Sequence, residues 1–124
     1  MTNSEIYKKV LGMIDLTSLN STDTFSKIRG MVDKVNGFHG KYPQYPLPAS
    51  ICVYPNFAST VAKARTSDDV HVTVVGGCFP ASQSTLAVKV AECSGAVRDI
   101  DHIPGRDDSL ILATGCQKHH SQNR

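Results

Sequence analysis

The stretch ASICVYPNFASTVAKARTSDDVHVTVVGG, residues 49–77, decides the fold of this chain. Residues 49–54 form a short, nearly continuous apolar run that ends at Pro55, and residues 70–75 form a β-branched run that ends at two glycines. The segment between them, residues 57–65, is predicted to be a helix. A strand, a helix and a second strand predict a right-handed βαβ unit with parallel strands.

Two amphipathic helices are predicted on the N-terminal side of this unit, over residues 4–13 and 22–35. Their apolar residues recur at helical spacing: Ile6, Val10 and Met13 in the first, and Phe25, Ile28, Val32 and Val35 in the second. Thr22 or Asp23 suits the N-cap of the second helix. Residues 36–48 contain three glycine or asparagine residues and three prolines, a composition that predicts a loop.

The C-terminal side continues the alternation of strands and helices. Leu86, Val90, Cys93 and Val97 recur at i, i+4, i+7 and i+11, which predicts a helix face, and residues 99–103 are predicted to form a third strand. The fold class is therefore predicted to be α/β with a parallel sheet.

Residues 110–113 have the composition of one more buried strand, but only about six residues separate them from Ile103. A parallel crossover needs a dozen or more residues. Either the two segments form an irregular hairpin or one of them is not a strand. The domain is expected to span residues 1–115, followed by a polar, disordered tail over residues 116–124.

Composition and charge exclude several classes of function. The 124 residues carry a formal net charge of +2 without a run of five or six like charges, so neither nucleic acid nor an anionic membrane is an expected partner. The sequence contains no signal-peptide pattern and no apolar run of about 18 residues. Its cysteines, Cys52, Cys78, Cys93 and Cys116, form no C-x-x-C pair and read as reduced thiols. A cytoplasmic location is expected.

Four motifs, in order and at family-like spacing, make residues 8–98 resemble deoxyribose-phosphate aldolase, a class I aldolase. They are Ile14-Asp15-Leu16-Thr17-Ser18-Leu19, Ala49-Ser50-Ile51-Cys52-Val53-Tyr54-Pro55, Val72-Thr73-Val74-Val75 with Gly77-Cys78-Phe79-Pro80, and Lys89-Val90-Ala91-Glu92. The resemblance implies a (β/α)8 TIM barrel. Since a complete barrel has about 250 residues, a partial (β/α)8 barrel with two N-terminal helices is expected.

The resemblance becomes patchy after residue 98. Ile100-Asp101-His102-Ile103 is similar to a family strand without its usual lead-in, and residues 110–115 are similar to a later strand whose preceding helix is absent. An internal deletion followed by a shifted or foreign tail would explain both departures.

The resemblance implies a carbon-carbon lyase that reversibly cleaves 2-deoxyribose 5-phosphate to glyceraldehyde 3-phosphate and acetaldehyde through a lysine Schiff base. No metal or organic cofactor is expected, because the imine is itself the electron sink. The family motif Phe-Ile-Lys-Thr-Ser-Thr-Gly does not occur here. Most lysines fall on predicted helices, Lys41 falls in the predicted loop, and Lys118 is in the polar tail, so this chain alone is expected to be inactive.

Site residues are carried over from the resemblance by position. Asp101 matches a family carboxylate in proton relay, and its alternative is a turn or capping aspartate. Asp15 and Thr17 match positions near the substrate, but Asp15 could equally end the first helix. Cys52 matches an accessory cysteine that lines the active site, and its alternative is a packing thiol.

Two other groups of residues are candidate sites. Cys78 after two glycines suggests a nucleophile or a phosphate cradle, but a plain loop cysteine is favoured. Cys116, His119 and His120, with His102, are possible zinc ligands on a poorly organised tail, and no metal site is expected.

Three interpretations remain open. The first is an aldolase-family lyase with an incomplete chain, whose small phosphorylated sugar or aldehyde substrate the resemblance implies. The second is a noncatalytic barrel fragment that self-associates as a homo-oligomer or pairs with another barrel piece, because exposed sheet edges demand a cover. The third is a small metal-binding protein that uses the tail.

Overall fold

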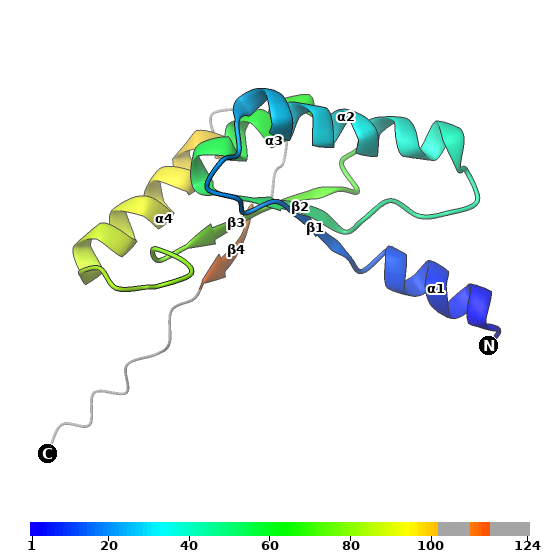
Figure 1. The fold of residues 1–124 in the computed structure, drawn as a ribbon, viewed down its shortest axis with the longest axis horizontal. Helices are drawn as coiled ribbons and strands as arrows, with labels where there is room; N and C mark the ends of the chain where they lie inside the picture. The colour runs from blue at the N-terminus through cyan, green and yellow to red at the C-terminus, as the bar shows by residue number, and fades with distance from the viewer. Residues whose placement is uncertain (102–109, 115–124) are drawn as a thin grey trace, which may run out of the picture.

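The computed structural model describes residues 1–101 and 110–114, whose strands form one four-stranded parallel sheet (Figure 1). The strands are β1 (Asp15–Thr17), β2 (Ser50–Val53), β3 (His71–Gly76) and β4 (Leu110–Thr114), and they lie in that order across the sheet. The predicted α/β class with parallel strands is therefore confirmed.

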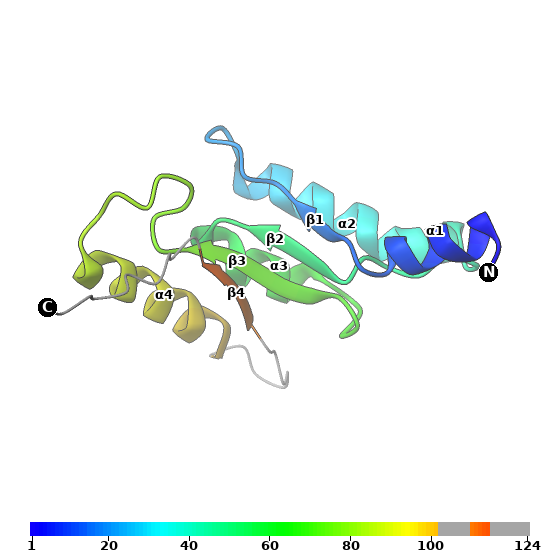
Figure 2. The same cartoon turned by 90° about the horizontal axis from the view of Figure 1, so that it is seen from below.

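Helices connect each strand to the next. They are α2 (Phe25–Lys41) after β1, η1 (Pro55–Phe57) and α3 (Ala58–Ala64) after β2, and α4 (Leu86–Asp101) after β3, while α1 (Asn3–Leu11) precedes the sheet. In Figure 1, α2 and α3 cover the same face of the sheet, and Figure 2 shows β2 and β3 in front of α3 from the opposite side. One face of the sheet is thus packed against helices.

The core lies between that face and the helices. Ile51, Val53, Val72 and Val74 of the two central strands pack with buried side chains of the helices, which include Ile28, Val32, Val61, Ala62 and Ile100. Burying one such aliphatic side chain stabilises the fold by roughly 1.5–3 kcal/mol. The apolar run at residues 49–54 and the β-branched run at residues 70–75 thus predicted both central strands correctly.

The structure explains why the strands predicted at residues 99–103 and 110–113 are too close in sequence for a parallel crossover. The strand predicted over residues 99–103 is wrong, because α4 continues through Asp101. The strand predicted at residues 110–113 is confirmed as β4, which pairs in parallel with β3. Since α4 itself is the crossover between β3 and β4, its 16 residues satisfy the length that a parallel connection needs.

Two N-terminal boundaries also differ from the prediction. Helix α2 runs to Lys41, so the loop predicted over residues 36–48 begins only after Lys41. Gly37 and Gly40 lower the helix propensity of this segment. Two contacts offset this loss: Val35 packs in the core, and the rings of Phe38 and Tyr42 lie with their centroids 5.2 Å apart. Strand β1 was missed because three residues are too short to show a period of two.

The orientation of α4 departs from the predicted apolar face. Ala96 and Ile100 are the buried residues of α4, which packs against α3, η1 and β3. Leu86, Val90 and Val97 of the predicted face are instead 73%, 54% and 40% exposed. The helix was predicted correctly, but its most regular apolar stripe does not face the core of the described fold.

Some predictions fall outside the described residues, including the polar tail over residues 116–124. The limits of the predicted domain are likewise not tested. Within the described segments, no helix is both long enough and apolar enough to span a lipid bilayer.

The observed orientation of α4 predicts unequal effects of two similar truncations. Ile100→Ala should lower the free energy of unfolding by about 2–4 kcal/mol, because the side chain is 1% exposed and a cavity would remain. Val97→Ala, on the exposed stripe, should change it by less than about 0.5 kcal/mol. Urea denaturation measures both values, and the opposite ranking would mean that α4 packs through the stripe predicted from the sequence.

Candidate functional site

The face of the sheet opposite to the helix-packed core carries polar side chains. The register aligns Asp15 with Ser50, and Thr17 with Cys52 and Thr73. Since side chains alternate between the two faces of a strand, all five of these residues share one face. In a closed (β/α) barrel this is the inner face, which surrounds the barrel axis.

A short chain of hydrogen bonds crosses three strands on this face. Thr73 Oγ1 donates to Ser50 Oγ at 2.9 Å, and Ser50 Oγ donates to Asp15 Oδ1 at 2.6 Å. Ser50 and Thr73 are buried, whereas Asp15 is exposed. The buried hydroxyls therefore satisfy each other and hold an accessible carboxylate in one position. We call Asp15, Ser50 and Thr73 the inner-face triad.

The predicted residues Asp15, Thr17 and Cys52 are brought together here. The alternative in which Asp15 ends the first helix is wrong, because α1 ends at Leu11 and Asp15 begins β1. Ser50 and Thr73 were not among the predicted site residues. Each of them is a polar residue inside an apolar run of the sequence. The sequence alone does not show that they share a face of the sheet, because this depends on the register of β2 and β3.

Cys52 is a buried thiol beside the inner-face triad. Burial raises the pKa of Cys52, a hydrogen bond with the Thr17 side chain opposes that effect, and the Asp15 carboxylate raises the pKa further. A raised pKa keeps the thiol protonated near neutral pH, where it is a poor nucleophile. Burial and a raised pKa suit the packing thiol that was the alternative for Cys52, and its accessory role in an active site stays a prediction.

The loop after β1 lies at the carboxyl end of that strand, where barrel enzymes place their sites. Asp23 organises it: Lys27 Nζ donates to Oδ1 at 2.6 Å, Ser18 Oγ donates to Oδ2 at 2.8 Å, and the Asn20 backbone N–H donates to Oδ2 at 3.1 Å. The Lys27 ammonium and the hydrogen bonds from Ser18 and Asn20 lower the pKa of Asp23 to about 2, although burial opposes them.

Cys78 lies at the carboxyl end of β3, in a turn with positive φ at Gly77 and Cys78. Its backbone N–H donates to Glu92 Oε2 at 2.8 Å, and its Sγ lies 2.7 Å from Ser84 Oγ. The Glu92 carboxylate is therefore hydrogen-bonded to the backbone, and the Cys78 thiol is hydrogen-bonded to the Ser84 hydroxyl. This arrangement fits the structural loop cysteine favoured by the sequence.

The lysines within the described residues all lie on helices. They are Lys8 and Lys9 on α1, Lys27, Lys34 and Lys41 on α2, Lys63 on α3, and Lys89 on α4. Lys41 was predicted in a loop and instead ends α2. Lys89 Nζ donates to Ser82 Oγ at 2.9 Å, and Lys118 falls outside the described part. None of the described lysines follows a strand at its carboxyl end.

Asp101 is the last residue of α4 and does not lie on a strand. Its role in proton relay stays a prediction. The possible zinc ligands Cys116, His119, His120 and His102 lie beyond the described segments, within which no group of three or more His, Cys, Asp or Glu side chains could hold a metal ion.

Known proteins provide an independent comparison. No protein-family model matches the sequence. A Caenorhabditis elegans protein assigned as a deoxyribose-phosphate aldolase is 32% identical over 123 residues, which cover 89% of this chain and 38% of that protein. The chain therefore spans well under half the length of this relative.

Solved structures of aldolases share the fold. A Coccidioides immitis protein assigned as a deoxyribose-phosphate aldolase has a TM-score of 0.60 and 25% identity, over 85% of this chain and 36% of that protein. The aldolase QR15 has a TM-score of 0.58 and 27% identity, over 73% of this chain and 36% of that protein. The predicted family resemblance and the partial TIM-barrel fold are both confirmed.

The Asp23 network predicts a pH dependence of stability. Because folding lowers the pKa of Asp23 from 3.8 to about 2, its stabilising contribution is present above pH 4 and is lost as the pH falls towards 2. Asp23→Asn should remove this part of the acid dependence in urea denaturation between pH 2 and 5. Asp33→Asn, at the exposed pair with Arg29, is the control and should leave it in place. An unchanged slope in Asp23→Asn would contradict the network.

Proposed function

Since this chain is homologous to part of a deoxyribose-phosphate aldolase, we propose that it forms the substrate-facing part of an aldolase-type barrel. The reaction is reversible cleavage of 2-deoxyribose 5-phosphate to glyceraldehyde 3-phosphate and acetaldehyde through a lysine Schiff base. Among the described residues, the inner-face triad is the single observation that carries this proposal, because it holds an accessible carboxylate on the face of the sheet that surrounds the axis of a closed barrel.

The chemistry of the site suits a polyhydroxylated substrate. The Asp15 carboxylate accepts a hydrogen bond from Ser50 through one oxygen and retains acceptor capacity for a substrate hydroxyl or a water. Thr17 and the protonated Cys52 thiol lie in the neighbouring row of the same face. A carboxylate held this way can take up a proton through water during cleavage of a carbon-carbon bond.

The lysine is the component that this part of the barrel does not supply. An imine lysine must be partly neutral near pH 7, which requires desolvation or a nearby cation. Of the described lysines, Lys27 and Lys89 reach loops that follow strands, where they donate to Asp23 and to Ser82. We therefore assign the substrate side to this chain and the imine lysine to another piece of the barrel, neither to a described lysine nor to Lys118.

Trapping of the imine tests this assignment. The chain is incubated with acetaldehyde and borohydride, and adducts are read by intact mass and then by peptide mapping. We expect only the low, distributed labelling of surface lysines, unchanged in Lys118→Ala. One saturating adduct at a single lysine, with retro-aldol turnover that a substitution of that lysine abolishes, would overturn the assignment.

A second candidate function is self-association of a noncatalytic barrel piece, and the exposed stripe of α4 favours it. Leu86, Val90 and Val97 present aliphatic surface along α4, which contacts the edge strand β4 of the described sheet. In a complete barrel, neighbouring helices pack side by side in an outer ring. A second copy that pairs with β4 would cover the strand edge and the stripe together.

Sedimentation velocity over a range of concentrations tests this candidate. The chain should associate with increasing concentration, and Val90→Lys should weaken the association at least about tenfold, because it places a charge within an apolar contact. Ala91→Lys adds the same charge to an exposed neighbour off the stripe and should have little effect. A monomer at all concentrations, or equal effects of the two variants, would rule out the stripe as the interface.

A further inference from the structure

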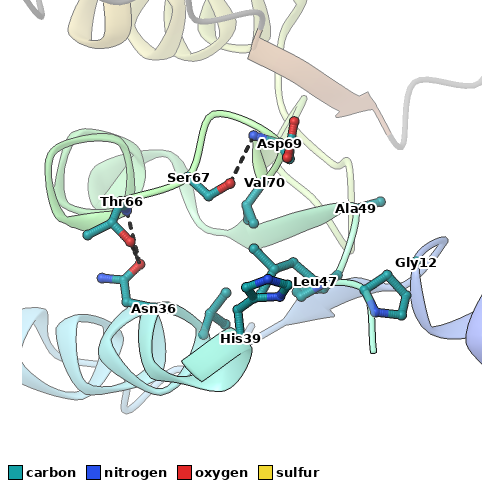
Figure 3. A pocket seen from close by; sticks show the side chains of 12 residues that line it. Gly12, Asn36, His39, Leu47, Ala49, Thr66, Ser67, Asp69 and Val70 are labelled. Carbon is teal, nitrogen blue, oxygen red and sulfur yellow. Dashed lines mark hydrogen bonds between the residues drawn. The ribbon is translucent and has the colours of Figure 1, made fainter. Parts of the chain in front are cut away.

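We propose that a pocket at the amino ends of β2 and β3 binds a small organic cation, an amine carried on a compact apolar ring. The pocket is formed by the second half of α2, by Leu47 to Ala49 ahead of β2, and by Thr66 to Val70 ahead of β3 (Figure 3). It lies at the end of the strands opposite to the carboxyl ends, so the inference does not rest on the proposed aldolase function.

The pocket has the volume and the partly apolar lining of a small-molecule site. Its volume is about 550 Å³, within the range of roughly 300–1,000 Å³ that is usual for ligand pockets. Leu47, Pro46 and Pro48 are partly exposed and supply apolar surface toward Gly12, while Val35 and Val70 lie buried beneath the lining. A ligand must therefore bring an apolar body to gain from this surface.

One wall of the pocket is held rigidly. Asn36 Nδ2 donates to the Ala64 carbonyl at 2.9 Å, and Asn36 Oδ1 accepts from the Thr66 backbone N–H at 3.0 Å and from Thr66 Oγ1 at 3.2 Å. These bonds, the last two of which are drawn in Figure 3, tie α2 to the segment after α3. The Asn36 amide is therefore engaged within the protein, and the wall is formed before any ligand arrives.

Two titratable side chains of the rim remain without a partner among the described residues. They are the His39 imidazole, whose ring lies next to Leu47 in Figure 3, and the Asp69 carboxylate. Ser67 Oγ accepts from the Asp69 backbone N–H at 3.3 Å, so its own O–H can still donate. The rim thus offers one carboxylate, one imidazole and one hydroxyl above an apolar floor.

This combination selects a cation over an anion. The charged side chain of the lining is the Asp69 carboxylate, because the nearby Arg65 guanidinium is buried and donates to the Val70 carbonyl. An ammonium can donate to the Asp69 carboxylate and to Ser67 Oγ. A flat ring can at the same time cover Leu47 and the neighbouring prolines of the lining.

Amide chemical shifts of the isotope-labelled chain test the proposal with benzylamine as the probe. Benzylamine should shift residues 35–39, 46–49 and 66–70 and saturate in the millimolar range, as expected for a fragment of this size. Benzyl alcohol keeps the ring without the charge and should bind at least about threefold more weakly, the scale of one exposed ion pair.

A matched pair of variants completes the test. Asp69→Asn should weaken benzylamine binding to the level of benzyl alcohol, while Asp68→Asn, one residue away and not part of the pocket lining, should leave it unchanged. Equal binding of amine and alcohol to the unmodified chain would overturn the proposal without any variant. Non-saturating shifts, or equal losses in Asp68→Asn and Asp69→Asn, would also overturn it.

Discussion

The parallel register of β1, β2 and β3 is the constraint on which the rest of the structure depends. It aligns Asp15 with Ser50 and Thr17 with Cys52 and Thr73, and it aligns Leu16, Ile51 and Val72 on the other face. A slip of one residue in β2 would turn Ser50 towards the helices and Ile51 towards the polar face. The core and the candidate site are therefore determined by the same pairing.

The two ends of the sheet have different properties. At the carboxyl ends, Asp23 and Cys78 belong to loops whose polar groups are bonded to one another. At the amino ends, the pocket beside α2 keeps His39 and Asp69 without partners in the described structure. In barrel enzymes the carboxyl end carries the chemistry, so binding at the amino end would be a separate property of this chain.

Much of the fold follows from local patterns. The two central strands, the helix between them and the amphipathic parts of α1 and α2 could be predicted, because their apolar residues recur at the periods of strands and helices. The family resemblance could also be predicted, since it rests on four separate motifs. The register brings Asp15, Thr17 and Cys52 together, the residues that the resemblance matched to substrate-binding positions.

The misses have physical reasons. Three-residue β1 shows no period, and α2 continues past two glycines because tertiary packing outweighs their low helix propensity. The face of α4 was misjudged because the packing of α4 against α3, η1 and β3, which local spacing does not show, buries Ala96 and Ile100 and leaves Val90 and Val97 exposed. Ser50 and Thr73 escaped notice because their partnership depends on pairing between strands distant in sequence.

A double-mutant cycle on Asp15 and Ser50 tests the inner-face triad most directly. The free energies of unfolding of Asp15→Ala, Ser50→Ala and the double variant are compared with that of the parent chain in urea. A hydrogen bond between a buried hydroxyl and a carboxylate predicts a coupling energy of about 1 kcal/mol or more. Additive effects within about 0.3 kcal/mol would contradict the triad and the register that produces it.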